Sequence, residues 1–178
     1  MSVLKLRALA LEDAKVTWAW RNKEEISNLY SGHPFPVSYD QEKAWYDKVM
    51  YSNFPTTVFG IELEGEGKKE LIGLTTLTNI NMLNRTCDFS ILIGVENYRG
   101  KGFSKTATQL TLAFGFNELG LNKIALRVRQ GNDVAINLYK RLGFVTEGVL
   151  KQNVFRNNQF QDEIAMAIFK SDFIKSNT

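Results

Sequence analysis

The chain has 178 residues, of which 44% are hydrophobic and 23% are charged, and its formal net charge is only +3. This composition excludes a disordered chain and predicts one folded domain spanning residues 1–178. The basic residues form no long run, no apolar stretch approaches the ~20 residues of a spanning helix, and no secretory signal is recognised, so we expect a cytoplasmic protein that binds neither nucleic acid nor membrane.

The predicted elements alternate between strands and helices over much of the chain. In chain order they are a strand at residues 3–7, a helix from about residue 11, a helix opened by a capping box at Ser38 to Gln41, a hairpin of residues 58–63 and 71–78, a strand at residues 88–93, a helix from residue 103, a strand at residues 123–128, a short helix ending before Gly143, and a hairpin of residues 144–155 and 160–169. This order predicts an α/β fold (α+β in some schemes), with a mixed β-sheet flanked by helices on both faces.

Apolar spacing also predicts which helix faces are buried. On the longer helix of the second half these residues are Phe103, Ala107, Leu110 and Phe114. On the short helix that follows they are Ala135, Leu138, Tyr139 and Leu142. The single cysteine, Cys87, stands among apolar strand residues and is expected to be a buried thiol, not a nucleophile.

The strongest local signal is the run Arg99-Gly100-Lys101-Gly102-Phe103-Ser104, between a predicted strand and a predicted helix. Two glycines let the backbone curl so that successive N–H groups and the helix N-terminus converge on an anion such as a pyrophosphate. A Walker A loop is disfavoured because Gly102 follows Lys101 where Ser or Thr is required. A dinucleotide fingerprint is disfavoured because Lys105 stands in place of its third glycine.

A second motif follows about 28 residues later and reads Asn132-Asp133-Val134-Ala135-Ile136-Asn137-Leu138-Tyr139-Lys140-Arg141-Leu142-Gly143-Phe144. The two motifs, in this order, resemble the Gln/Arg-x-x-Gly-x-Gly/Ala coenzyme A loop and the Asn-x-x-Ala-x-x-Leu-Tyr-x-x-x-Gly-Phe motif of the GNAT superfamily of acetyl-CoA-dependent N-acetyltransferases. Ser104 departs from the pattern, which prefers Gly or Ala there. The resemblance covers essentially the whole chain and is closest to the spermidine/diamine and the ribosomal-protein alanine N-acetyltransferases.

The resemblance implies acetyl-CoA as co-substrate, no metal, and a homodimer formed through the final strands. The backbone amides of the loop would wrap the pyrophosphate, a strand edge would pair with the pantetheine arm, and two asparagines would bind that arm. The coenzyme-binding residues implied in this way are Ile91, Leu92, Ile93, Arg99, Gly100, Lys101, Gly102, Phe103, Ser104, Asn132, Asn137 and Tyr139.

Acetyl transfer to an amine requires a deprotonated nucleophile and a protonated leaving thiolate. The phenol of Tyr139 is the proposed general acid; the alternative is a tyrosine that only packs on its helix face. Asp88 is a candidate base if burial raises its pKa or a water chain carries the proton, and otherwise it is a solvated strand residue. His33 titrates in the right range, although a single loop histidine can be incidental.

The acceptor is less defined by the sequence. Arg21, next to Trp20 and Asn22, can reach a substrate carboxylate or phosphate, and His33 lies in the loop that relatives use beside the acceptor. Residues 31–36 contain no acidic pair for a polyamine, so a small amine, an amino sugar or a peptide N-terminus is favoured. A polyamine acceptor is the alternative, and a non-catalytic acyl-CoA sensor is the rival from another functional class.

Overall fold

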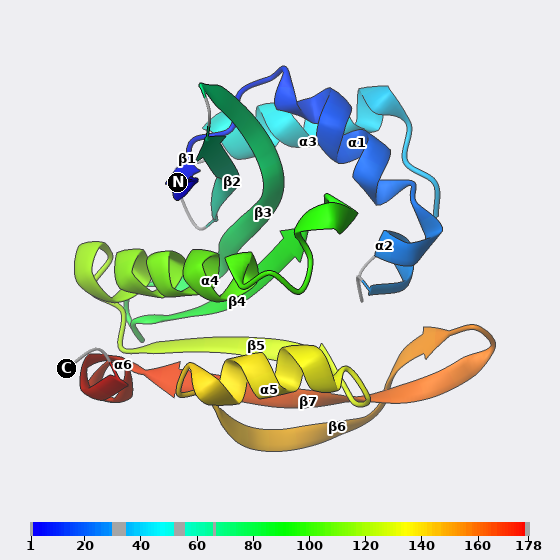
Figure 1. Ribbon diagram of the computed structural model, residues 1–178. Coiled ribbons are helices and arrows are strands. Elements are labelled where there is room, and N and C mark those ends of the chain that lie inside the picture. The colour runs from blue at the N-terminus through cyan, green and yellow to red at the C-terminus, as the bar shows by residue number, and fades with distance from the viewer. Residues whose placement is uncertain (1, 30–34, 52–55, 66, 177–178) are drawn as a thin grey trace. The chain divides into compact units, whose positions relative to one another are not determined.

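The computed structural model describes residues 2–29, 35–51, 56–65 and 67–176 (Figure 1). The strands are β1 (Val3–Arg7), β2 (Thr57–Gly65), β3 (Lys68–Asn81), β4 (Thr86–Ile93), β5 (Lys123–Arg129), β6 (Val145–Arg156) and β7 (Gln159–Phe169). The α-helices are α1 (Asp13–Arg21), α2 (Glu24–Leu29), α3 (Tyr39–Tyr51), α4 (Phe103–Ala113), α5 (Asp133–Arg141) and α6 (Lys170–Ser176). The strands form one seven-stranded mixed sheet in the order β1-β2-β3-β4-β5-β7-β6, which confirms the predicted α/β fold.

The backbone contacts divide the chain into two compact units. Unit 1 comprises Met1–Thr78 and Ser90–Thr111, and unit 2 comprises Asn79–Phe89 and Leu112–Thr178. Strands β3 and β4 and helix α4 each contribute residues to both. The single domain expected from the sequence therefore stays a prediction.

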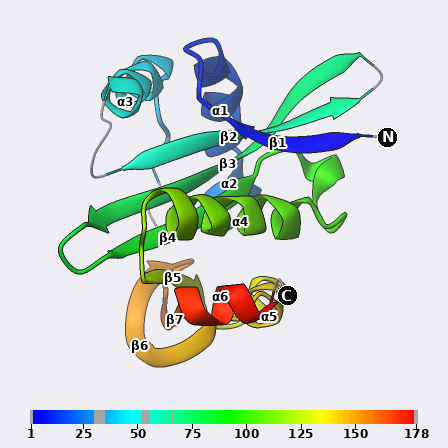
Figure 2. The same ribbon diagram turned by 90° about the vertical axis from the view of Figure 1, so that its left-hand side faces the viewer.

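Helices cover both faces of the sheet in unit 1, where β1, β2 and β3 are antiparallel neighbours. Leu92 of β4 belongs to a cluster with Trp20 of α1, Ile26 of α2 and Tyr46 of α3. Ile93 belongs to a second cluster that includes Ala107 of α4. Because successive strand side chains point to opposite faces, α1–α3 cover one face and α4 the other (Figure 2).

Unit 2 is built on a sheet of parallel and antiparallel pairs. Residues Thr86, Cys87 and Asp88 of β4 pair in parallel with β5, and β5, β7 and β6 follow as antiparallel neighbours. Helix α5 ends at Arg141 with Leu142 as its C-cap, and the following Gly143 has a φ of 95°, the left-handed conformation that the sequence predicts there. The capping box of α3 in unit 1 also forms, since Gln41 N donates to Ser38 Oγ at 3.1 Å and Ser38 N to Gln41 Oε1 at 2.8 Å.

The predicted buried faces of α4 and α5 need correction. Leu110 is 40% exposed and Phe103 and Phe114 are only half-buried, whereas Thr108 and Thr111 are fully buried. The two threonines are buried without unsatisfied hydroxyls because each donates to the carbonyl four residues earlier, at 2.7 and 2.8 Å. On α5, Ala135 and Leu138 are only half-buried. The buried residues of this helix are Tyr139 and Ile136, and apolar spacing did not predict Ile136.

Two short helices, α2 and α6, were not expected from the sequence, and α2 proves important for the site. Among the described residues no helix is long and apolar enough to cross a membrane. In the same part of the chain no group of three His, Cys, Asp or Glu side chains could hold a metal ion.

Candidate functional site

The predicted pyrophosphate loop leads from a short 3-10 helix (Glu96–Tyr98) into α4, in unit 1. Gly100 has a φ of 73° and Gly102 a φ of 87°, a region that side chains other than glycine rarely adopt. A Cβ built on either glycine meets nothing within 4 Å, so the space above both is open. The loop therefore presents bare backbone at the N-terminus of an eleven-residue helix, as an anion site requires.

The last residues of β4 lie between this loop and the helices on the opposite face. Ile91 and Ile93 face the cluster that contains Ala107, whereas Leu92 faces α1–α3. The adjoining Gly94 approaches α1 so closely that a Cβ there would overlap the Trp20 ring. Trp20 is accordingly a packing residue, 5% exposed, and the close approach fixes the end of β4 against α1.

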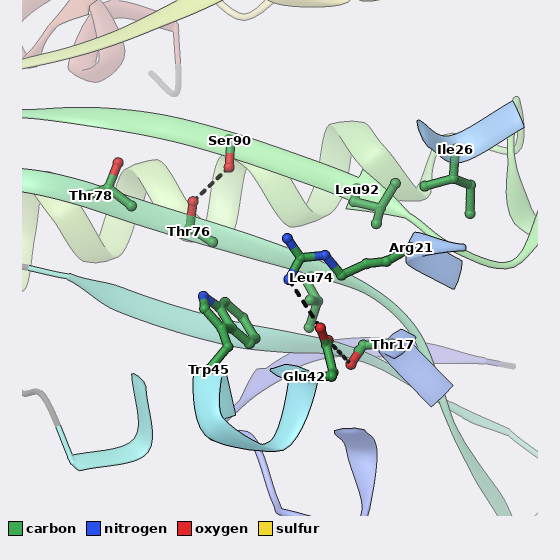
Figure 3. A pocket seen from close by; sticks show the side chains of 10 residues that line it. All are labelled: Thr17, Arg21, Ile26, Glu42, Trp45, Leu74, Thr76, Thr78, Ser90 and Leu92. Atoms are coloured by element: carbon green, nitrogen blue, oxygen red, sulfur yellow. Dashed lines mark hydrogen bonds and ion pairs between the residues drawn. The ribbon is translucent and has the colours of Figure 1, made fainter. Parts of the chain in front are cut away.

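Unit 1 contains a cavity of about 220 Å³ on the α1–α3 side of its sheet (Figure 3). Its floor is one face of β3 and β4, and its other wall comes from α1, α2 and α3. The lining residues are Thr17, Arg21, Ile26, Glu42, Trp45, Leu74, Thr76, Thr78, Ser90 and Leu92. Leucines line one stretch of the floor and hydroxyls the next, and Thr76 Oγ1 is 2.7 Å from Ser90 Oγ.

An ion pair closes one side of the cavity. Arg21 Nη1 donates to Glu42 Oε2 at 3.0 Å, and Thr17 Oγ1 donates to Glu42 Oε1 at 2.6 Å. The Glu42 side chain is fully buried and that of Arg21 is 34% exposed, with its guanidinium carbon 5.8 Å from the centre of the Trp45 ring. Burial raises the pKa of the adjacent Tyr46 phenol, so this hydroxyl stays neutral. Arg21, predicted as an acceptor contact, thus lines this cavity, and its charge is compensated by Glu42.

Hydrogen bonds hold the segment before α3 against the C-terminal end of α1. Trp18 Nε1 donates to the carbonyl oxygen of Val37 at 2.7 Å, and Asn22 binds both the N–H and the carbonyl of Val37, at 2.9 and 3.0 Å. The shared helix face of Trp18 and Asn22 therefore holds the chain where it enters α3. His33, predicted as a base and an acceptor contact, lies outside the described residues.

Tyr139 lies in unit 2, within an aromatic group. Its ring is edge-on to Phe89 at 6.3 Å and 5.5 Å from Phe144, and the residue is 9% exposed. Asn132 caps α5, since its Oδ1 accepts a hydrogen bond from Ala135 N at 3.3 Å. Asn137 is exposed on the same helix. The cap uses the Oδ1 atom of Asn132 and not its Nδ2 group.

Comparison with known proteins decides the family. The sequence model of the GNAT acetyltransferase domain matches residues 4–145. A spermidine N(1)-acetyltransferase of Vibrio cholerae is 35% identical over 173 residues, which are 97% of this chain and 96% of that protein. This chain belongs to the GNAT acetyltransferase family. The spermidine N(1)-acetyltransferase of Escherichia coli K12 is 32% identical over 96% of this chain and 88% of its own length.

Solved structures agree with this assignment. The Vibrio cholerae spermidine N-acetyltransferase in complex with CoA and spermine superimposes with a TM-score of 0.88 at 34% identity, over 96% of this chain and 98% of that one. A dodecameric structure of the same enzyme gives a TM-score of 0.82 at 32% identity, over 98% of both chains. The protein is therefore an acetyl-CoA-dependent N-acetyltransferase.

The exposure of Asp88 and of Cys87 bears on the roles that the sequence predicts for them in this GNAT enzyme. Asp88 is exposed and accepts a hydrogen bond from Asn79 Nδ2 at 2.8 Å, so it lacks the burial that a direct base requires, which leaves the water-mediated route and the alternative of a solvated strand residue. Cys87 is 3% exposed, and burial raises the pKa of its thiol to about 12, with a smaller contribution from the Asp88 charge. The prediction that Cys87 is a buried, unreactive thiol agrees with this geometry.

Several residues of the cavity were missed from the sequence of this acetyltransferase. Glu42 and Trp45 line the cavity and share one face of α3 with the core residue Tyr46 by their i, i+3 and i+4 spacing, so an acidic residue on an otherwise aromatic face was a usable signal. Thr76 and Ser90 gave no comparable signal because hydroxyl residues are common in strands. The loop and the Arg21 cavity belong to unit 1, whereas Asp88, Asn132, Asn137 and Tyr139 belong to unit 2.

Proposed function

We propose that this N-acetyltransferase acetylates a primary amine of a small polyamine, with spermidine as the first acceptor to test. The observation that carries the proposal is the similarity to two spermidine N(1)-acetyltransferases, at 35% and 32% identity over nearly the whole chain. The solved relative with a TM-score of 0.88 holds CoA and spermine, which are the two ligand classes that the proposal requires.

The cavity of unit 1 is the proposed acceptor site. It offers the carboxylate of Glu42, the ring of Trp45 and a row of hydroxyls, which are suitable partners for ammonium and amine groups. Arg21 also lines the cavity, but its repulsion of a polyamine is reduced because its guanidinium is paired with Glu42 at 3.0 Å. Because Arg21 and Glu42 neutralise each other, the cavity has no net negative charge for a polycation, and the support for a polyamine comes from the relatives and not from the charge of the cavity.

The proposed chemistry is direct attack of the neutral amine on the thioester of acetyl-CoA. The loop of residues 99–104 holds the pyrophosphate, and the strand residues Ile91–Ile93 supply a backbone N–H for the developing oxyanion. Tyr139 protonates the departing thiolate, whose pKa near 8.5 lies below that of a phenol near 10, so the thiolate needs only modest assistance. The proton of the incoming ammonium leaves through water, with Asp88 or His33 as the receiving group.

A second acceptor class is favoured by one specific observation. The Arg21 guanidinium lines the cavity, and only its Nη1 is bonded to Glu42, so its remaining N–H groups suit a carboxylate or phosphate on the acceptor. An amine that carries such a group, for example an amino-sugar phosphate, is the matching substrate.

An amine panel distinguishes these acceptors. The release of free CoA from acetyl-CoA should be followed with spermidine, putrescine, an amino-sugar phosphate, an amino acid and a peptide with a free N-terminus. We expect spermidine to be the most efficient, and a tenfold higher kcat/KM for the amino-sugar phosphate would replace the polyamine by the second class. In pH–rate profiles, Asp88→Asn and His33→Ala should be compared, because the receiving group is the one whose removal abolishes the acidic limb.

We also propose that the protein self-associates. A relative with 32% identity forms a dodecamer, and Val145, Val149, Phe155 and Phe160 on β6 and β7 are each more than 40% exposed. Light scattering should therefore give a multiple of the 20.3 kDa chain mass, and a monomer at micromolar concentration would contradict the proposal.

A further inference from the structure

Arg99, the first residue of the pyrophosphate loop, has an incompletely bonded guanidinium. Its Nε donates to the carbonyl oxygen of Ile93 at 3.1 Å, and its Nη1 lies 3.6 Å from Glu25 Oε1. Its Nη2 is buried and has no hydrogen-bond partner in the described part of the chain. A buried donor without an acceptor is uncommon in folded proteins, because its lost hydration is not replaced. The Nη2 group therefore requires an explanation.

The contact with Glu25 is long for an ion pair of these two groups. Charge-assisted hydrogen bonds between guanidinium and carboxylate are normally about 2.7–2.9 Å, whereas this pair is separated by 3.6 Å. The Glu25 side chain is also 46% exposed, so water competes for its carboxylate. Glu25 is thus a weak and exchangeable partner.

A phosphate bound by the glycines of this loop would supply stronger hydrogen-bond acceptors for Arg99 than Glu25 does. Gly100 and Gly102, with their left-handed φ values, leave the backbone N–H groups uncovered by side chains. Because Arg99 directly precedes Gly100, its long side chain can reach a phosphate that is bound to these groups. The planar fork of arginine matches two phosphate oxygens, and those oxygens can accept from the N–H groups that Ile93 and Glu25 leave unbonded.

We propose that Glu25 is a positioning residue that holds the Arg99 guanidinium in the coenzyme-free protein and is displaced by a coenzyme phosphate. The proposal rests on the assignment of residues 99–104 as the coenzyme loop. Glu25 belongs to α2, and the next residue, Ile26, is 1% exposed and lines the acceptor cavity. The exchange of partners at Arg99 therefore links the coenzyme loop to a helix of the acceptor site.

Titration calorimetry with CoA tests the exchange without any acceptor. Glu25→Gln removes the competitor for Arg99, so the Kd for CoA should fall about two- to fivefold, the range expected for a partly exposed ion pair. Glu24→Gln removes the same charge from the neighbouring exposed residue and should leave the Kd unchanged. In an Arg99→Gln background, Glu25→Gln should have no effect on the Kd.

Steady-state kinetics provide the second measurement. With the amine identified by the panel, the effect of Glu25→Gln should appear in the KM for acetyl-CoA and not in kcat, which a general loss of structure would not produce. An unchanged or higher Kd in Glu25→Gln, an equal change in Glu24→Gln, or a retained change in the Arg99→Gln background would each overturn the proposal. If the unmodified protein does not bind CoA, the loop assignment itself is wrong.

Discussion

The buried Glu42 allows a prediction about stability and the acceptor cavity together. Glu42→Gln keeps the size of the side chain but removes the charge that compensates Arg21. The single amide oxygen of the glutamine can accept from Thr17 Oγ1 or from Arg21 Nη1, which now lie 2.6 and 3.0 Å from the two carboxylate oxygens, but not from both. The substitution therefore removes the charge pair and one of the two hydrogen bonds that the carboxylate accepts.

The expected loss follows from the burial of the two groups. Removing one partner of a fully buried ion pair costs about 3–5 kcal/mol. The Glu42 side chain is 0% exposed, but that of Arg21 is 34% exposed and keeps part of its hydration. We therefore expect the free energy of unfolding to fall by about 2–3 kcal/mol.

Urea unfolding at constant m-value measures this loss. The matched control is Asp40→Asn on the same helix, because Asp40 is 88% exposed in its pair with Lys43 and should change stability by less than about 0.5 kcal/mol. Adding Arg21→Met to Glu42→Gln should recover part of the loss, since the guanidinium is then no longer uncompensated. Stability within about 0.5 kcal/mol of the parent for Glu42→Gln alone would refute this account of the ion pair.

Three further predictions concern the coenzyme and the reactive side chains. CoA at 100 times its Kd should stabilise the protein by about 2.7 kcal/mol, or about 5–10 °C in Tm; Gly102→Glu should abolish this shift, and an undiminished shift would remove the loop from the site. Tyr139→Phe should lower kcat on the order of 10²-fold while the Kd for CoA is retained; an unchanged kcat would show that the thiolate leaves without this phenol. Cys87, whose burial raises the pKa of the thiol to about 12, should react with iodoacetamide at pH 8 only after denaturation, as mass spectrometry would show; rapid labelling of the folded protein would contradict the burial.

Local signals were sufficient for most of the fold because they are determined by neighbouring residues. The capping box of Ser38 and Gln41 and the left-handed Gly143 are formed as predicted, since each depends on a few consecutive positions. The buried face of α4 was misjudged because hydrophobicity alone favoured Leu110. Thr108 and Thr111 could be buried instead because their hydroxyls bond within the helix, and apolar spacing carries no information about that.

In the candidate site, too, the features set by neighbouring residues could be predicted and the long-range contacts could not. The two GNAT motifs predicted a coenzyme loop at residues 99–104 and placed Tyr139 on a helix, because motif spacing is a property of the sequence; the structure forms this loop before α4 and has Tyr139 on α5. The partner of Arg21 was not identified, because Glu42 is 21 residues away in the chain and only the packing of α1 on α3 brings the two together. The contact of Arg99 with Glu25 is equally non-local, and it depends on α2, which the sequence analysis did not predict.

The acceptor assay tests the central claim most directly. Purified protein should be incubated with acetyl-CoA and spermidine, the release of free CoA followed, and the product identified by mass spectrometry. We predict acetylspermidine, formed with a kcat/KM of ~10⁴ M⁻¹s⁻¹ or above, the efficient range for enzymes. Absence of CoA release with spermidine and with every other primary amine of the panel, from a protein that binds CoA, would contradict the claim.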